Sequence, residues 1–344
     1  MMTINVLIVD DSALVRAVLT EIINQAPDMN VVGVAKDAFV ARDMVNKYEP
    51  DVITLDIQMP EISGLVFLER LMKARPTPVV MVSTLTADGA VETLKALEIG
   101  AIDYIEKPKI AVAKGLENYQ SILQNKIRTA AKANLQKIQS ISSSHFTPVA
   151  AGSNITHKIV ALGASTGGTE ALKAVLRRIP AKFPPIIITQ HMPVGFTKTF
   201  ADRLNGLCEI TVKEAEDGEP IKPNTAYIAR GDRHLTLQLI NDALTIKFVD
   251  GELVSGHKPS VDMMFKSVAD VAGNRAVGVL LTGMGKDGAA GLLAMKKHGA
   301  QTFAQDESSS IVFGMPKEAL RIGATTQAIP LSQIAQKISQ ALAI

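Results

Sequence analysis

The 344-residue sequence has little cysteine and no long apolar run: Cys208 is its single cysteine. One cysteine excludes an intrachain disulfide framework and a zinc site built from thiolates, which is typical of proteins of the reducing cytoplasm. A membrane-spanning helix needs about 20 mostly apolar residues, and no uncharged run of that length exists. The formal net charge is only +2, so we expect no general attraction to nucleic acid and no insertion into a membrane.

The N-terminus also lacks the features of a signal peptide. Its MMTINVLIVDD has no positively charged segment before the apolar run, and two aspartates end that run. A hydrophobic content of 47% with 20% charged residues describes a globular chain. The length allows two domains, each with its own core. We therefore expect a soluble, cytoplasmic, two-domain protein that is a monomer.

Residues 4 to 110 alternate short apolar runs with amphipathic ones, which predicts five β/α units. Uniformly apolar strands this short suit a parallel sheet covered on both faces. We predict a flavodoxin-like, doubly wound α/β domain with strand order 2-1-3-4-5. The expected strands are Asn5–Val9, Val31–Ala35, Val52–Leu55, Val79–Val82 and Ile102–Ile105. The expected helices are Leu14–Gln25, Ala38–Lys47, Leu65–Ala74 and Val91–Ile99.

Chemically active side chains follow four of these strands: Asp10 with Asp11, then Asp56, Ser83 and Lys107. The carboxyl ends of neighbouring parallel strands share one edge of the sheet, so these groups should converge. Clustered carboxylates repel one another unless a cation is present, and hard oxygen ligands suit Mg²⁺. A carboxylate beside Mg²⁺, a hydroxyl and a lysine can attack a phosphoryl group. The alternative is that the aspartates only cap the following helices.

The motifs VLIVDDS, LDIQMPEISG, MVSTLT and YIEKP resemble those of a response-regulator receiver domain. The resemblance covers residues 4 to about 110 and implies that Asp56 is the phosphoacceptor. It also implies that a histidine kinase is the phosphodonor. The remaining implied roles are metal binding by Asp10, Asp11, Asp56 and the Gln58 carbonyl, phosphate contact by Ser83 and Lys107, and a switch aromatic at Tyr104.

The segment Lys114–Lys137 has helical periodicity and five basic residues against the lone Glu117. Its basic residues form either a solvent-exposed face or a binding surface for an acidic partner. Ser140–Asn154 is serine-rich and aperiodic, which is typical of a flexible linker. We place the receiver domain at 1–130, the linker at 131–156 and a second domain at 157–344.

The second domain begins with KIVALGASTGG, Lys158 to Gly168, in which a strand breaks sharply into a helix at Ser165. Such a turn exposes a serine hydroxyl beside a helix N-terminus, where free N–H groups stabilise negative charge. Further alternation of strands and helices predicts a second mainly parallel, Rossmann-like sheet. Leu235–Val249, divided at Asn241 and Asp242, is predicted to form a β-hairpin within this domain.

Three strand ends of this domain present Ser165, His191 and Asp287. A hydroxyl nucleophile, an imidazole that takes and returns its proton, and a carboxylate that orients the imidazole are the set needed for acyl transfer. The order Ser, His, Asp differs from that of α/β-hydrolases, which disfavours that fold. His234 and His257 are rivals for the imidazole role.

Two other function classes are open at this point. Gly283, Gly285 and Gly288 match the GxGxxG pattern of a dinucleotide-binding turn, with Asp306 near the expected acidic position. Fewer than 40 residues remain after Asp306 to complete such a fold, and the pattern leaves the serine turn without a role. A receiver joined to a DNA-binding module would need a small basic output with a helix-turn-helix pattern, and the second domain is large, sheet-forming and not basic.

The motifs GASTGG, QHMP, GDRHL, HKPSVD, LLTGMGKDGA and QDESSSIVFGMPKEA resemble the catalytic domain of the chemotaxis protein-glutamate methylesterases. The resemblance implies that Ser165 is the nucleophile, His191 the general base and acid, and Asp287 its orienter. It places the oxyanion near the backbone of Thr166 and Met284.

The same resemblance implies the substrate and the regulation. The substrates would be glutamate methyl esters, and selected glutamines, on the cytoplasmic helices of chemoreceptors. The hydrolase reaction would need no cofactor. The receiver would cover the triad until Asp56 is phosphorylated.

Overall fold

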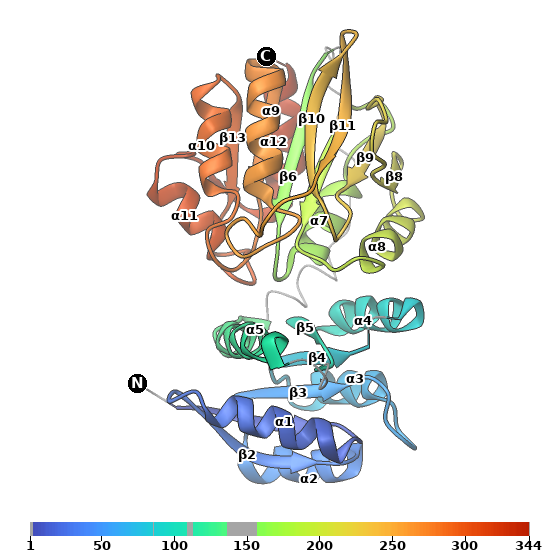
Figure 1. Ribbon diagram of the computed structural model, residues 1–344, viewed down its shortest axis with the longest axis vertical. Coiled ribbons are helices and arrows are strands. Elements are labelled where there is room, and N and C mark those ends of the chain that lie inside the picture. The colour runs from blue at the N-terminus through green and yellow to red at the C-terminus, as the bar shows by residue number, and fades with distance from the viewer. Residues whose placement is uncertain (1–2, 85, 109–112, 136–156, 344) are drawn as a thin grey trace. The chain divides into compact units, whose positions relative to one another are not determined.

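The structure, a computed structural model, describes residues 3–84, 86–108, 113–135 and 157–343 (Figure 1). It divides into two compact units, Met1–Gln139 and Ser140–Ile344. Of the predicted linker 131–156, residues 136–156 lie outside the described residues. Among the described residues, every helix is too short or too polar to span a bilayer.

The N-terminal unit contains a five-stranded parallel sheet in the order β2-β1-β3-β4-β5, which confirms the predicted flavodoxin-like topology (Figure 1). Its strands are β1 Ile4–Val9, β2 Met29–Ala35, β3 Val52–Asp56, β4 Val79–Ser83 and β5 Asp103–Glu106. Its helices are α1 Ala13–Asn24, α2 Ala38–Tyr48, α3 Gly64–Ala74, α4 Ala87–Ile99 and α5 Ala113–Ala131.

Side-chain caps set where helices α1, α2, α3 and α4 begin. Ser12, Asp37, Ser63 and Thr86 each accept a hydrogen bond from a backbone N–H in the first turn of the following helix. The cap at Thr86 explains why α4 begins four residues before the expected Val91. The three inner strands, β1, β3 and β4, are buried along most of their length, which fits a sheet covered on both faces.

Helix α5 uses two of its basic residues within its own unit. Lys126 Nζ lies 2.6 Å from Asp103 Oδ1, and Arg128 makes a two-pronged pair with Asp28 at 2.7 Å. Bidentate arginine–carboxylate pairs fix geometry as well as charge. These two cations therefore fasten α5 to its own domain, which takes them out of the basic face considered for an acidic partner.

The second unit contains a seven-stranded parallel sheet in the order β14-β13-β12-β6-β7-β9-β8, together with a separate antiparallel β10-β11 hairpin. Both the parallel sheet and the hairpin confirm the predicted fold class. The sheet strands are β6 Ile159–Ala164, β7 Ile186–Gln190, β8 Thr211–Glu214, β9 Thr225–Ile228, β12 Ala276–Leu280, β13 Gln301–Gln305 and β14 Ala328–Ile329. The hairpin strands are β10 His234–Ile240 and β11 Ala243–Val249.

Helices cover both faces of this sheet. Helices α9 and α10 pack together on one face, while α7 and α12 pack together on the other (Figure 1). The helices are α7 Gly168–Leu176, α8 Phe196–Asn205, α9 Val261–Ala272, α10 Ala289–Lys297, α11 Met315–Arg321 and α12 Leu331–Ala343. Helices α8, α9, α11 and α12 were not predicted from the sequence.

The strand order reverses beside β6. The chain runs from β6 to β7 and the strands beyond it, and then returns to place β12 on the opposite side of β6. In open α/β sheets, the crevice at the carboxyl ends of strands at such a switch point is where ligands bind. The first residues after β6 and β7 and the loop after β12 therefore meet at one edge.

Candidate functional sites

Ser165 lies directly after the buried strand β6, at a turn that glycines make possible. Gly167 has φ +76° and precedes α7 as its N-cap. A side chain on Gly168 would collide with Gln190, because its Cβ would lie 2.1 Å from Oε1 of that residue. Only glycine fits these two positions, and the turn brings the serine to the N-terminus of α7.

His191 bridges Ser165 and Asp287 in the structure. Its Nδ1 lies 3.1 Å from Ser165 Oγ, and its Nε2 lies 2.8 Å from Asp287 Oδ2. An ionised carboxylate can only accept, so Nε2 carries the proton of the neutral ring and Nδ1 accepts from the serine hydroxyl. The structure thus brings together the three side chains that the sequence pattern singled out.

Asp287 accepts four hydrogen bonds. Besides His191, the donors are the Ser260 hydroxyl at 2.8 Å and the backbone N–H groups of Val261 at 2.7 Å and Asp262 at 3.1 Å. The two N–H groups belong to the first turn of α9, whose partial positive charge favours an anion. Burial acts to raise the pKa of Asp287, but the hydrogen bonds from His191, Ser260 and Val261 outweigh it and hold the pKa below its ordinary value.

Ser260 also belongs to this site, although it was not among the predicted site residues. Its hydroxyl caps α9, accepting from Met263 N, while donating to Asp287. A signal was available, since Ser260 precedes Val261, Met264, Phe265 and Val268 at helical spacing. That pattern would have predicted the helix and its cap, although not the contact with Asp287.

The two rival histidines both lie near the triad but in other roles. His234 is buried; its Nδ1 accepts from Ser260 N at 3.1 Å, and its Nε2 lies 3.0 Å from the Glu252 carbonyl. His257 lies over the His191 ring, with ring centroids 3.7 Å apart and planes inclined by 12°. Neither ring bridges the serine and the carboxylate as His191 does.

The glycine-rich stretch after β12 packs against the serine turn. A Cβ on Gly283 would lie 2.8 Å from Ser165 Cβ and 2.3 Å from Met315 Sδ. Asp306, the acidic residue of the dinucleotide pattern, accepts hydrogen bonds from Ser308 and Ser309 in its own turn. The glycines thus serve close packing beside Ser165, and the dinucleotide interpretation is not favoured.

The two positions expected near an oxyanion border the same turn. The carbonyl of Thr166 accepts from Thr282 Oγ1 at 3.0 Å, and Met284 follows Gly283. The Ser165 N–H donates to the Thr282 carbonyl at 3.0 Å and so is already engaged.

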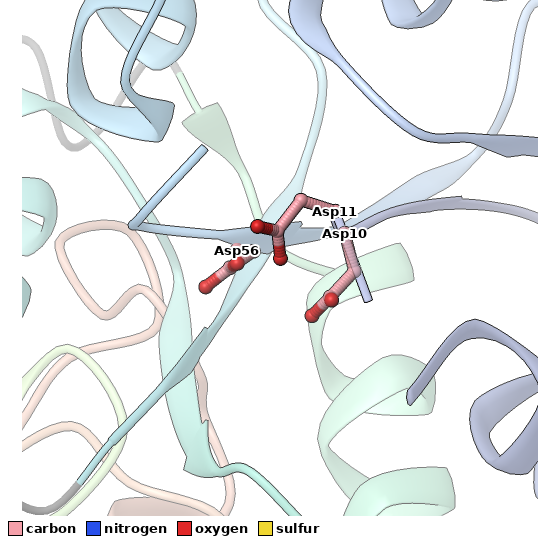
Figure 2. A group of neighbouring side chains, drawn as sticks. All are labelled: Asp10, Asp11 and Asp56. Atoms are coloured by element: carbon pink, nitrogen blue, oxygen red, sulfur yellow. The ribbon is translucent and has the colours of Figure 1, made fainter. Parts of the chain in front are cut away.

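The N-terminal unit gathers Asp10, Asp11 and Asp56 at the carboxyl ends of β1 and β3 (Figure 2). One carboxylate oxygen from each lies within 4.8 Å of the others, with Asp10 and Asp56 buried and Asp11 exposed. Lys107 Nζ lies 2.8 Å from Asp56 Oδ2 and 3.5 Å from Asp10 Oδ2. Burial raises the pKa of Asp56 to about 6, despite the lysine.

The acidic cluster fits a hard divalent cation. Burial also raises the pKa of Asp10, whose Oδ1 accepts from Ser12 N, while its buried Oδ2 accepts no hydrogen bond from the described residues and has the Lys107 ammonium 3.5 Å away. Buried carboxylate oxygens that converge without enough donors are the ligands that Mg²⁺ takes. Gln58 lies two residues beyond Asp56, to which its N–H donates at 3.3 Å.

The remaining receiver residues, Ser83 and Tyr104, lie on strands β4 and β5. Ser83 ends β4, and its hydroxyl accepts from Thr93 Oγ1 of α4 at 2.9 Å. Tyr104 lies in β5, is buried, and has Lys126 Nζ 5.7 Å from its ring centre. Burial raises the pKa of this phenol well above its ordinary value.

Each of the two units matches a known protein family. Residues 160–338 match the family described as CheB methylesterase, and residues 6–114 match the response regulator receiver domain. The protein-glutamate methylesterase/protein-glutamine glutaminase of Escherichia coli (strain K12) is 53% identical over 339 residues, covering 98% of this chain and 97% of that relative. The enzyme of the same name from Yersinia pestis bv. Antiqua (strain Antiqua) is 53% identical over 342 residues, with the same coverage of both chains.

A solved structure supports the fold of the second unit. The crystal structure of the Thermotoga maritima CheB methylesterase catalytic domain is similar with a TM-score of 0.52 and 38% identity, covering 56% of this chain and 99% of that one. The chain therefore belongs to the CheB methylesterase family, in the form that carries a response-regulator receiver domain ahead of the esterase domain.

Proposed function

We propose that this chain is a phosphorylation-activated serine hydrolase that demethylates glutamate methyl esters on the cytoplasmic domains of chemoreceptors. The observation that carries the proposal is His191 lying between Ser165 and Asp287 at 3.1 Å and 2.8 Å. The names of relatives that are 53% identical over nearly the whole chain support the substrate. They also support a second reaction, deamidation of selected receptor glutamines.

The acyl step follows from the hydrogen bonds of His191. Ser165 Oγ attacks the ester carbonyl carbon while its proton passes to His191 Nδ1, and Asp287 stabilises the imidazolium through Nε2–H. When the tetrahedral intermediate collapses, the C–O bond to the methoxy group breaks, and Nδ1–H gives its proton to the departing methoxide, which leaves as methanol. Backbone N–H groups at the start of α7, near Thr166, and at Met284 would stabilise the oxyanion.

Deacylation reverses these roles with water as the nucleophile. His191 Nδ1 takes a proton from water, the hydroxide oxygen adds to the acyl carbon, and Ser165 leaves with the proton returned from Nδ1. The product is a glutamate carboxylate. With a glutamine side chain the same sequence releases ammonia in place of methanol, and no cofactor takes part.

In the receiver, Asp56 is the proposed phosphoacceptor and a chemotaxis histidine kinase the phosphodonor. Asp10, Asp11, Asp56 and the Gln58 carbonyl would hold Mg²⁺, which supplies positive charge for phosphoryl transfer when bound. Lys107 already pairs with Asp56 at 2.8 Å and would contact the phosphate, together with Ser83. Tyr104 would respond to the change as the switch aromatic.

The domain boundaries, the cellular location and the oligomeric state are part of the same proposal. We assign residues 1–130 to the receiver, 131–156 to a linker and 157–344 to the esterase domain. We place the protein in the cytoplasm as a monomer, without nucleic acid as a partner. Lys126 and Arg128 are paired within the receiver, which supports the solvated-face interpretation of the basic segment.

One assay tests the function: methanol release from membranes carrying methylated chemoreceptors, with and without acetyl phosphate and Mg²⁺. We expect release that rises with the phosphodonor. Membranes from cells that lack the receptor methyltransferase provide the control, because they carry no ester. Absence of methanol from methylated membranes under both conditions would contradict the proposal.

A further inference from the structure

Two hydrogen bonds fix the positions of the His191 ring nitrogens, but they only weakly restrain the tilt of the ring. A further contact is needed to fix that tilt. Hydrogen bonds at the ring nitrogens of an imidazole are best made in the ring plane, and His191 makes two of them, between Nδ1 and Ser165 and between Nε2 and Asp287. Two such bonds leave one soft motion, a rocking of the ring about the line that joins the two nitrogens. Rocking bends both hydrogen bonds out of line, and hydrogen bonds weaken steeply as they bend.

The neighbouring ring blocks this motion. The imidazole of His257 lies nearly parallel to His191, with centroids 3.7 Å apart and an interplanar angle of 12°. At this separation the two faces are in van der Waals contact, so His191 cannot tilt toward His257 without overlap.

His257 is itself placed by a tight turn. Val254 and His257 exchange backbone hydrogen bonds at 3.1 Å and 3.0 Å. The two residues between them, Ser255 and Gly256, have φ of +53° and +81°. Positive φ at both central positions is the geometry of a type I′ hairpin turn, which fixes the direction in which the chain leaves it.

The same segment also supports Asp287. Three residues beyond His257, Ser260 donates to Asp287, and α9 begins there with two further donors. His234 connects the two ends of the loop of residues 252–260. Its Nδ1 accepts from Ser260 N, and its Nε2 lies 3.0 Å from the Glu252 carbonyl. One segment, residues 254–262, therefore touches both the face of His191 and the carboxylate that orients it.

We propose that His257 is a positioning residue: its ring face holds the His191 imidazole at the tilt at which Nδ1 meets Ser165 and Nε2 meets Asp287. This inference rests on the proposed esterase function. It requires a flat aromatic face at position 257 and no proton transfer by His257, so a phenyl ring should serve in place of the imidazole.

The kinetic test uses the full chain with acetyl phosphate and Mg²⁺, and compares His257→Phe with His257→Leu on methylated receptor membranes. Leucine is bulky but not flat, so we expect its kcat to fall about 10- to 100-fold with KM little changed, the size of loss that slight misplacement of a catalytic group causes. Phenylalanine should recover most of that loss. His298→Ala is the control, since His298 ends α10 and bonds the Ala294 carbonyl.

Three kinetic outcomes would overturn the proposal. One is a leucine variant with wild-type kcat. Another is a phenylalanine variant as slow as the leucine variant, which would assign His257 a chemical role. The third is a rise in KM alone, which would make His257 a substrate contact. Thermal unfolding of each variant shows whether a loss of rate reflects a loss of folded protein.

A second measurement does not depend on the substrate. In the full chain with ¹⁵N-labelled histidines, the proton on His191 Nε2 should give a downfield, slowly exchanging NMR signal, assigned by its loss in Asp287→Ala. We expect the signal to persist in His257→Phe and to broaden in His257→Leu. An unchanged signal in His257→Leu would overturn the positioning role. A wild type that keeps this signal but releases no methanol would instead refute the proposed function.

Discussion

The hydroxyl of Ser260 donates to Oδ1 of Asp287 at 2.8 Å, and both residues are buried. The same oxygen of Ser260 also accepts from Met263 N at 3.4 Å as the cap of α9. The serine thus joins the start of a helix to the carboxylate of the triad, and a single change should affect both stability and rate.

Ser260→Ala should lower stability by about 1 kcal/mol, the usual cost of a lost N-cap. It should also lower kcat about tenfold, because Asp287 loses one of the donors that hold it toward His191. Urea unfolding and steady-state methanol release measure the two effects separately. Ser267→Ala is the matched control, since Ser267 makes hydrogen bonds on α9 to Leu237 and Met264 and none to the triad. Equal kcat values for the two variants would contradict the expected role of Ser260.

Ser165→Ala should lower the rate of methyl-ester hydrolysis by about 10⁴-fold or more, because it removes the hydroxyl that lies 3.1 Å from His191 Nδ1. Labelling of the receiver by a phosphodonor should be unchanged, since Asp56 belongs to the other unit. Initial rates and phosphate incorporation are measured on the same preparation. Activity within tenfold of wild type would remove Ser165 from the nucleophile role.

Asp56→Asn should block incorporation of phosphate, because an amide is a poor nucleophile and takes a negative charge out of the cluster with Asp10 and Asp11. In the wild type, a chelator should block labelling as well. Asp51→Asn is a suitable control, since Asp51 is an exposed carboxylate that bonds Asn5 N. Equal labelling of Asp56→Asn and wild type would show that another residue is phosphorylated.

The pKa of Asp56 predicts how metal-free stability depends on pH. Burial raises this pKa to about 6 from 3.8, so the folded state holds the proton more tightly than the unfolded chain. The contribution of Asp56 to stability therefore falls as pH rises from about 4 to about 6, and is constant above that. Since one pKa unit corresponds to about 1.4 kcal/mol, metal-free Asp56→Asn should be about 1–3 kcal/mol more stable than wild type at pH 8.

Urea unfolding in the presence of a chelator, at pH 5 and pH 8, measures this difference in the transition of the N-terminal unit. The difference in free energy of unfolding between variant and wild type should be smaller at pH 5 than at pH 8. At pH 8 it should also become smaller when Mg²⁺ is added to the wild type. A variant less stable than the metal-free wild type at pH 8 would show that the buried charge of Asp56 is fully compensated.

A fragment that begins near residue 153 should fold alone, because the second unit has its own seven-stranded sheet and its own core. We suppose that the unphosphorylated receiver covers the triad and that this closed state is favoured by about 1.4–3 kcal/mol of free energy. The fragment should then demethylate receptors roughly tenfold to a hundredfold faster than the unphosphorylated chain. Its rate should not respond to a phosphodonor. Initial rates at equal concentration decide this, and a fragment slower than the resting chain would make the receiver an activator.

Much of both sites could be predicted from sequence because parallel strands collect their carboxyl ends at one edge. Asp10, Asp56 and Ser83 lie at or just after strand ends, as do Ser165 and His191. In each case a short apolar run ends at a polar residue, which is a local signal. The order of strands then follows from the β/α alternation, so the convergence of these side chains could be anticipated before any contact was known.

The contacts that hold the triad in place could not be predicted in this way. Ser260 and Asp287 are 27 positions apart in the chain, and only the packing of α9 against the sheet brings them together. The stacking of His257 on His191 depends on a hairpin turn with two positive φ values. The position of Asp287 in three dimensions likewise determines which nitrogen of His191 faces Ser165. No local sequence pattern encodes that position.

The pairing of β12 with β6 has a consequence for how the protein is made. Ala276 lies opposite Ile159 in the sheet, and β12 leads into the loop that carries Asp287. During synthesis the serine and histidine therefore leave the ribosome long before their carboxylate partner, and closing so distant a strand pair is a late event in folding. Ser165 and His191 therefore stay without the carboxylate of Asp287 until most of the chain has been translated, so a nascent chain, or one truncated before Asp287, lacks the complete set of three side chains.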